Sequence, residues 1–165
     1  MKNPSGTPQP SSAAFLLAQV GSHAARKFAE RLAPLRLSPP HAGILGVLRR
    51  SEGLSQQGLA EVLHMHPSGL VAIIDELEER GLVKRQNSLE DRRTYELHLT
   101  GKGQAALRDI GRVGQEHNEA LCAALSERER AQLTGFLQRI ADEQGLTPGV
   151  HPGFSQLGRR QKRSG

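Results

Sequence analysis

Apolar residues recur at steps of three or four along residues 12–36, which is the spacing of one face of an α-helix. Pro34 ends or kinks this helix near its end, because proline lacks a backbone hydrogen-bond donor. A long helix with one apolar stripe needs a partner to cover that stripe. The stripe comprises Leu17, Val20, Ala24, Phe28, Leu32 and Leu35.

Three shorter helices are predicted next, over residues 38–50, 55–63 and 66–80, where apolar side chains again follow helical spacing. Serine or proline residues stand at their starts, where serine caps the first turn and proline fits it without strain. The second and third of these helices are separated only by the short turn His64-Met65-His66.

The pattern then changes from helical to alternating. In Tyr95–Leu99 apolar and polar residues alternate, which is typical of a strand buried on one side. Leu82–Arg85 is short and suited to an extended conformation, and a polar loop over residues 86–93 joins the two segments. The sequence therefore predicts a β-hairpin after the three short helices.

Two further helices complete the pattern. Thr100 is placed to cap the first, and Ser126 with Glu129 forms a capping box for the second, which Gly145 ends. Their apolar stripes consist of Leu107, Ile110, Val113, His117 and Leu121, and of Leu133, Phe136, Leu137 and Ile140. The fold class is therefore mainly α with a small β-hairpin wing.

Composition narrows the class of protein. The chain of 165 residues has one cysteine, Cys122, so a disulfide-stapled secreted domain is excluded and a reducing, cytoplasmic location is expected. No apolar run reaches the ~18 residues that span a bilayer, so we expect no membrane partner. Residues 1–11 lack the apolar core of a signal peptide and are expected to be disordered.

The formal net charge is +5, which favours an anionic partner such as nucleic acid. Most of this charge lies in residues 146–165, expected to be a flexible basic tail, which hold four basic side chains and no acidic one. The tail either adds non-specific DNA affinity or only improves solubility. The remainder of the chain is close to neutral.

Two short helices with a tight turn, followed by a hairpin, are typical of a winged helix-turn-helix, whose second helix enters the major groove. On this interpretation the hairpin loop reaches phosphates or the minor groove through Arg92 and Arg93, with Asp91 orienting one of them. The alternatives are that Arg92 and Arg93 are only solvated loop charges, and that Ser68 only bonds backbone donors of its own helix. The candidate DNA-binding residues are His66, Pro67, Ser68, Gly69, Val71, Ala72, Asp91, Arg92 and Arg93.

Several segments resemble the multiple-antibiotic-resistance regulator (MarR) family. They are Leu54-Ser55-Gln56-Gln57-Gly58-Leu59-Ala60, His66-Pro67-Ser68-Gly69-Leu70-Val71, Asp75-Glu76-Leu77-Glu78-Glu79-Arg80-Gly81-Leu82-Val83, and Asp91-Arg92-Arg93 followed by Leu97-His98-Leu99-Thr100 and Gly103. The resemblance covers about residues 12–145. It implies a homodimeric transcription factor, usually a repressor, released from a pseudo-palindromic operator by a small anionic or phenolic effector. It also implies a DNA-binding part at 38–100, with residues 12–36 and 101–145 as dimerisation helices.

The chain departs from this family in its charge. Residues 38–100 hold seven basic and nine acidic side chains, and Ser68 to Ala72 carry no charge where many relatives place Arg or Lys. Recognition would then rest on Ser68, His66, backbone N–H groups and the wing. A winged helix used only for protein contact is the alternative, and loss of Arg92 would separate the two.

Other chemistry is less prominent. His23, His41 and His117 are candidates for a ligand pocket between the dimerisation and DNA-binding parts, with a hydrogen-bonded interior histidine as the alternative for His117. Cys122 is expected to be buried and inert, with a redox-responsive regulator as the alternative. His64 and His66 do not share a helix face, so no metal site is expected. No phosphate-binding loop, dinucleotide loop or nucleophile elbow occurs, so we expect neither cofactor nor catalysis.

Overall fold

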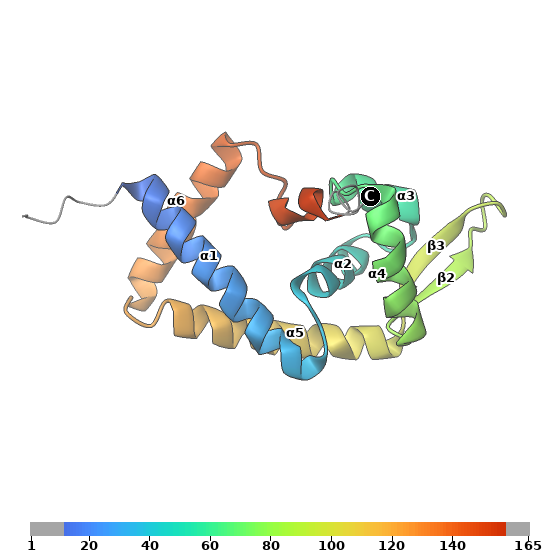
Figure 1. Ribbon diagram of the computed structural model, residues 1–165, viewed down its shortest axis with the longest axis horizontal. Helices are drawn as coiled ribbons and strands as arrows, with labels where there is room; N and C mark the ends of the chain where they lie inside the picture. Colours follow the sequence, from blue (N-terminus) through green and yellow to red (C-terminus); the bar gives the residue numbers. More distant parts are fainter. Residues whose placement is uncertain (1–11, 158–165) are drawn as a thin grey trace, which may run out of the picture.

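The structure is a computed structural model that describes residues 12–157. It is mainly helical with one small sheet (Figure 1), as the sequence predicts. The elements are α1 (Ala13–Leu32), η1 (Ala33–Leu35), α2 (Pro39–Arg50), β1 (Leu54–Ser55), α3 (Gln56–Val62), α4 (Pro67–Glu79), β2 (Val83–Asn87), β3 (Tyr95–Leu99), α5 (Gly101–Leu121), α6 (Glu127–Glu143) and η2 (Pro152–Gln156).

The predicted caps explain where most helices begin. The side-chain oxygens of Ser12, Ser55, Thr100 and Ser126 each accept a hydrogen bond from a backbone N–H in the first turn of the helix that follows. At Ser126 the bond is reciprocated by Glu129, whose carboxylate accepts from the Ser126 N–H at 2.8 Å. These bonds satisfy backbone donors that a helix start leaves without partners.

The hairpin is part of a three-stranded antiparallel sheet in the order β1-β3-β2. Val83 pairs with Leu99 and Asn87 with Tyr95, which is half exposed at the start of β3. Leu54 of β1 pairs with Leu97. The sequence did not predict β1, because two residues are too few to show alternation. Through β1 the sheet is joined directly to the start of α3.

The hydrophobic core lies under the helix-turn-helix and the sheet, within the winged-helix region (residues 38–100). Its fully buried side chains include Ile44, Leu45 and Leu48 of α2 and Leu70, Ile74 and Leu77 of α4. Leu32 at the end of α1 is buried with them. The start of α5 also contacts this core, so α5 runs from the winged-helix region to the opposite end of the molecule (Figure 1).

Apolar side chains remain exposed at that opposite end, where α1 and α6 lie (Figure 1). α6 has no buried residue, although Phe136 and Ile140 recur on it at helical spacing. Phe15 of α1 and Phe136 of α6 are 58% and 57% exposed. Along residues 12–157 no helix is long and apolar enough to cross a membrane.

After α6 the chain turns back onto the winged-helix region, and residues 146–157 are called the C-terminal strap (Figure 1). Phe154 is only 6% exposed and belongs to the core cluster, with Val150 and Leu157 packed against it. The strap therefore differs from the flexible tail that the sequence predicts. Its burial depends on contacts with α2, which lies far away in sequence. The basic residues Arg159 to Arg163 lie outside the described residues.

Candidate nucleic-acid interface

The turn His64-Met65-His66 sets the angle between α3 and α4. His64 has a left-handed backbone (φ 51°), which a non-glycine residue adopts only when its surroundings enforce it. Met65 is buried, and its N–H donates to the carbonyl oxygen of Ala60 at 2.9 Å. The turn is thereby fixed from both sides, and the start of α4 is left exposed.

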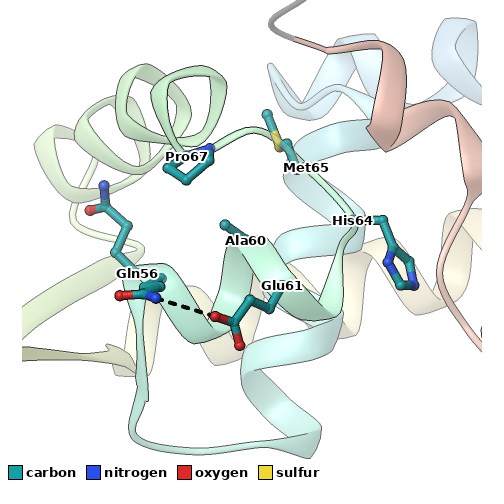
Figure 2. A pocket seen from close by; sticks show the side chains of 7 residues that line it. Gln56, Ala60, Glu61, His64, Met65 and Pro67 are labelled. Carbon is teal, nitrogen blue, oxygen red and sulfur yellow. Dashed lines mark hydrogen bonds between the residues drawn. The ribbon is translucent and has the colours of Figure 1, made fainter.

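An open hollow of about 640 Å³ lies beside this turn, lined by α3, the turn and Pro67 (Figure 2). Gln57 donates a hydrogen bond from Nε2 to the Glu61 carboxylate at 3.3 Å. Gln57 is exposed at this edge of α3, where its amide is suited to contact a sugar-phosphate backbone, whereas Gln56 is half-buried and its Oε1 accepts from Arg85 at 3.3 Å.

His66 caps α4. Its Nδ1 accepts the backbone N–H of Ser68 at 3.3 Å and lies 2.7 Å from the Ser68 hydroxyl. A backbone N–H can only donate, so Nδ1 is the acceptor in this bond. His66, Pro67 and Ser68 are all exposed, so this first turn presents the His66 ring and the Ser68 hydroxyl. Its backbone N–H groups are already bonded, because Pro67 has none and Gly69 donates to the His66 carbonyl oxygen at 3.0 Å.

The remaining α4 residues of the candidate set follow one exposed face. Val71 is 40% exposed and Ala72 is also exposed, while Gly69 is half-buried. The buried face of the same helix holds Leu70 and Ile74. The structure therefore brings the candidate residues of α4 together on a surface that faces solvent.

The wing loop, residues 88–94, is held by its own hydrogen bonds. The hydroxyl of the buried Ser88 accepts the N–H groups of Glu90 and Asp91 at 3.2 and 3.4 Å. Asp91 Oδ1 accepts the N–H of Arg93 at 2.9 Å. Arg92 and Arg93 are exposed, and no ion pair to either side chain occurs among residues 12–157. Asp91 thus shapes the loop that carries the two guanidinium groups.

Arg85 of β2 ties the wing to α4. Its Nη2 lies 2.5 Å from Asp75 Oδ1, its Nη1 pairs with the Glu78 carboxylate, and its backbone N–H donates to Glu78 Oε1 at 3.0 Å. Partial burial lowers the pKa of Arg85, but the hydrogen bonds to the two carboxylates outweigh burial and leave this pKa raised. The guanidinium therefore stays charged and fixes both acidic side chains.

Glu76 is engaged in the same way on the other side of α4. Its carboxylate lies 3.2 Å from Nε2 of the buried His41 and 3.7 Å from the Arg80 guanidinium. Arg80 also donates to the Arg36 carbonyl oxygen at 2.6 Å. Three of the acidic residues of α4 are thus bound to basic groups of the protein. These pairs place a basic group beside each of the three carboxylates, while the Asp75 and Glu76 side chains stay 58% and 51% exposed.

The three candidate pocket histidines lie in different places. His117 lines a pocket of about 560 Å³ between α1, α2, α5 and the strap, which we call the α1/α2/α5 pocket. Its ring centroid is 5.5 Å from that of Phe28. His41 instead caps α2 through Ser38, and the exposed His23 contacts Arg26, so neither lines this pocket. Burial lowers the pKa of His117, and the charges of Arg31 and His23 lower it further.

Comparison with known proteins identifies the family. The model of the MarR family matches residues 37–94. A Thauera aromatica protein assigned to transcriptional regulation of the hcr operon is 36% identical over 124 residues, which are 74% of this chain and 75% of that protein. The chain belongs to the MarR family of transcriptional regulators.

Solved structures of the MarR family share its winged-helix fold. The transcriptional repressor CouR, bound to a 23-mer DNA duplex, is 30% identical with a TM-score of 0.70, covering 79% of this chain and 92% of CouR. Wild-type MarR from E. coli in its apo form is 25% identical with a TM-score of 0.70, covering 80% of this chain and 98% of that one.

Sequence reasoning missed Arg85, Arg80 and Phe154. Arg85 acts through partners on other elements, and nothing in its local spacing marks it. Arg80 had a local signal, because it stands four residues after Glu76, the spacing of an ion pair on one helix face. For Phe154 a weak signal exists, because an aromatic residue is unusual in a chain with only 3% aromatics. Cys122 ends α5 and is half-buried. Within residues 12–157 no three His, Cys, Asp or Glu side chains are grouped as metal ligands would be.

Proposed function

We propose that this MarR-family chain is a homodimeric, ligand-responsive repressor that binds double-stranded DNA, with α4 in the major groove and the wing at the adjacent minor groove. The observation that carries the proposal is the arrangement of charge on one surface. The first turn of α4 is exposed and uncharged, while α4 carboxylates are bound by Arg85 and Arg80. Arg92 and Arg93 stand exposed on the wing beside them.

The chemistry of the α4 surface suits base contact without a charged side chain. The Ser68 hydroxyl and the His66 ring can hydrogen-bond base edges, and Val71 and Ala72 can contact the methyl group of thymine. Guanidinium groups suit the negative potential of a narrow minor groove. Because no bidentate arginine or amide stands on α4, each half-site contributes modest specificity, and a second copy of the chain supplies the rest.

The exposed apolar faces of α1 and α6 support a homodimer. Leu17, Val20, Phe136 and Ile140 are each 40% exposed or more, and within each helix the two residues stand three or four positions apart on one face. Contiguous apolar surface of this kind marks a protein-protein interface. A dimer formed through these helices places two winged-helix regions at a fixed separation, as binding to two half-sites requires.

The α1/α2/α5 pocket supports ligand control. Apolar residues such as Ala24, Phe28 and Ile110 line it, with His117 and Arg50 as polar groups, and this is the character of small-molecule sites. An aromatic or phenolic ligand with an anionic group fits that lining. Such a ligand changes DNA binding only if it prefers one dimer geometry over the other.

The wing provides the direct test of DNA binding. DNA bound by the wild-type protein is selected from a random pool, and the affinity for it is measured by gel shift over a range of salt concentrations. Replacing Arg92 and Arg93 by alanine is expected to weaken binding at least about tenfold and to lower the salt slope by about one for each phosphate that the wing no longer neutralises.

Arg128→Ala is the matched control for the single changes Arg92→Ala and Arg93→Ala, because it removes one positive charge, as each of them does, from α6 at the end of the molecule opposite the wing (Figure 1). Its affinity for DNA is expected to equal that of the wild type. If Arg128→Ala weakened DNA binding as much as a wing substitution does, the wing arginines would act only through the overall charge of the protein. Selection of no DNA by the wild type would favour a winged helix used for protein contact.

A further inference from the structure

The C-terminal strap is anchored on α2 by one aromatic ring. Phe154 is 6% exposed and lies over Gly43. A Cβ atom at position 43 would stand 2.5 Å from Cζ and 2.8 Å from Cε2 of this ring, well inside the distance that real contacts allow. The ring therefore depends on the absence of a side chain at position 43.

The same strap reaches the turn between α3 and α4. The Thr147 hydroxyl lies 2.8 Å from Nε2 of His64, the turn residue with the left-handed backbone. Between the two ends, Arg50 of α2 donates a hydrogen bond to the carbonyl oxygen of Gly149 at 3.5 Å. The strap thus contacts the α3–α4 turn at one end and α2 at the other.

The strap is also a wall of the α1/α2/α5 pocket. Gly149, His151 and Phe154 line the pocket together with residues of α1, α2 and α5. Any molecule that fills the pocket therefore contacts the strap as well as the helices. The backbone bonds within the strap are short-range, such as Phe154 N–H to the His151 carbonyl at 3.1 Å, and give it little stability of its own.

We propose that the C-terminal strap is a latch that couples occupancy of the α1/α2/α5 pocket to the α3–α4 turn, with Phe154 as its removable anchor. When the ring leaves Gly43, one wall of the pocket opens and the Thr147–His64 contact is released. This proposal rests on the proposed function only in treating the pocket as a ligand site. The coupling itself follows from contacts within one chain.

Amide hydrogen exchange of the full-length protein tests the latch, and the anchor contact can be broken from either side. Phe154→Ala removes the ring, and Gly43→Ala pushes it away while leaving a residue that favours a helix. Both changes are expected to speed exchange of the Phe154 and Leu157 amides at least about tenfold, and to speed exchange at His64 and Met65 too. The double variant is expected to match the single ones, because both break one contact.

Gly46→Ala is the matched control. It adds the same methyl group to the same helix and the same pocket, but its nearest neighbour would be an Arg50 nitrogen at 3.8 Å, an ordinary contact. It is expected to leave exchange in the strap and the turn unchanged. Faster exchange in the strap with no change at His64 and Met65 would overturn the coupling. Wild-type exchange in Phe154→Ala would overturn the anchor.

The pocket is probed with 8-anilinonaphthalene-1-sulfonate, an aromatic anion that fluoresces in apolar sites. Phe154→Ala is expected to bind it several-fold more tightly than the wild type or Gly46→Ala, because the ring no longer covers that side. Equal binding by all three proteins would contradict the role of the strap as a wall. Exchange and probe binding are both measured without DNA, so failure to bind DNA would refute the proposed function and leave these results standing.

Discussion

At some positions, close packing against a neighbouring backbone requires one particular residue type. Gly103 is the last residue of the motifs that resemble the MarR family. It lies in the first turn of α5, beside the connection between α4 and β2. A Cβ atom there would stand 2.0 Å from the Leu82 carbonyl oxygen. That same oxygen accepts the N–H of Thr100 at 3.1 Å, so it cannot move aside without breaking the start of α5.

Gly103→Ala is therefore expected to lower the free energy of unfolding by about 3 kcal/mol, at the upper end of overpacking costs because the obstacle is backbone. Gly101→Ala is the control, since a Cβ at position 101 meets nothing within 4 Å. Urea denaturation measures both. Equal stability of the two variants would show that α5 shifts freely at this point.

His117 makes stability depend on pH. Its pKa is lowered in the folded protein by burial and by the charges of Arg31 and His23, so the folded state binds fewer protons than the unfolded state. Above the unfolded pKa of about 6.5 this has no effect, and stability is lost as the pH falls from there towards the folded value.

His117→Phe is expected to reduce that loss, because phenylalanine keeps a ring beside Phe28 and binds no proton. Urea denaturation of both proteins at several values between pH 5 and 8 isolates the contribution, since the other histidines are shared. An identical pH profile for the two proteins would assign the dependence to those other histidines.

At the scale of elements, Arg85 makes β2, α4 and the start of α3 one unit. It contacts Asp75 and Glu78 of α4 and, through Nη2, the Gln56 side chain at 3.3 Å. The wing and the recognition helix therefore cannot move independently. The same contacts hold two carboxylates that would otherwise repel DNA phosphates.

Arg85→Ala is expected to lower stability by only about 1 kcal/mol, because the Asp75 and Glu78 side chains are 58% and 39% exposed. We expect its effect on DNA affinity to be larger, since both carboxylates are released near the phosphates. Adding Asp75→Asn and Glu78→Gln to this variant is expected to recover much of the affinity in gel shifts. A triple variant as weak as Arg85→Ala would assign the loss to wing position alone.

Elements were predictable from sequence where their residues interact with near neighbours. The stripes of α1, α5 and α6 and the cap at Ser126 depend on residues three or four positions apart, so the pattern contains them. β1, the strap and the contact of His41 with Glu76 depend on contacts between distant segments. Period and spacing carry no information on those contacts. The candidate residues on α4 and the wing could be chosen from sequence because the winged helix-turn-helix arrangement indicates which segments contact DNA. Arg85 could not be chosen in this way.

For the whole molecule, the exposed faces of α1 and α6 support the proposed homodimer, in which one chain is half of the functional unit. Phe136→Glu places a charge in the proposed interface and is expected to give a monomer in sedimentation at micromolar concentration, with a large loss of affinity for a two-half-site DNA. Ala131→Glu adds the same charge on the opposite face of the same helix and is the control. A wild-type monomer would contradict the dimer outright.

The placement of Tyr95 has a spectroscopic consequence. The chain has no tryptophan and a single tyrosine, and that tyrosine is half exposed at the first position of β3, directly next to the wing loop. Intrinsic tyrosine emission from the protein therefore originates at the wing alone. The molecule carries its own optical label at the hairpin, so wing contacts can be followed in the unmodified protein without attaching a dye.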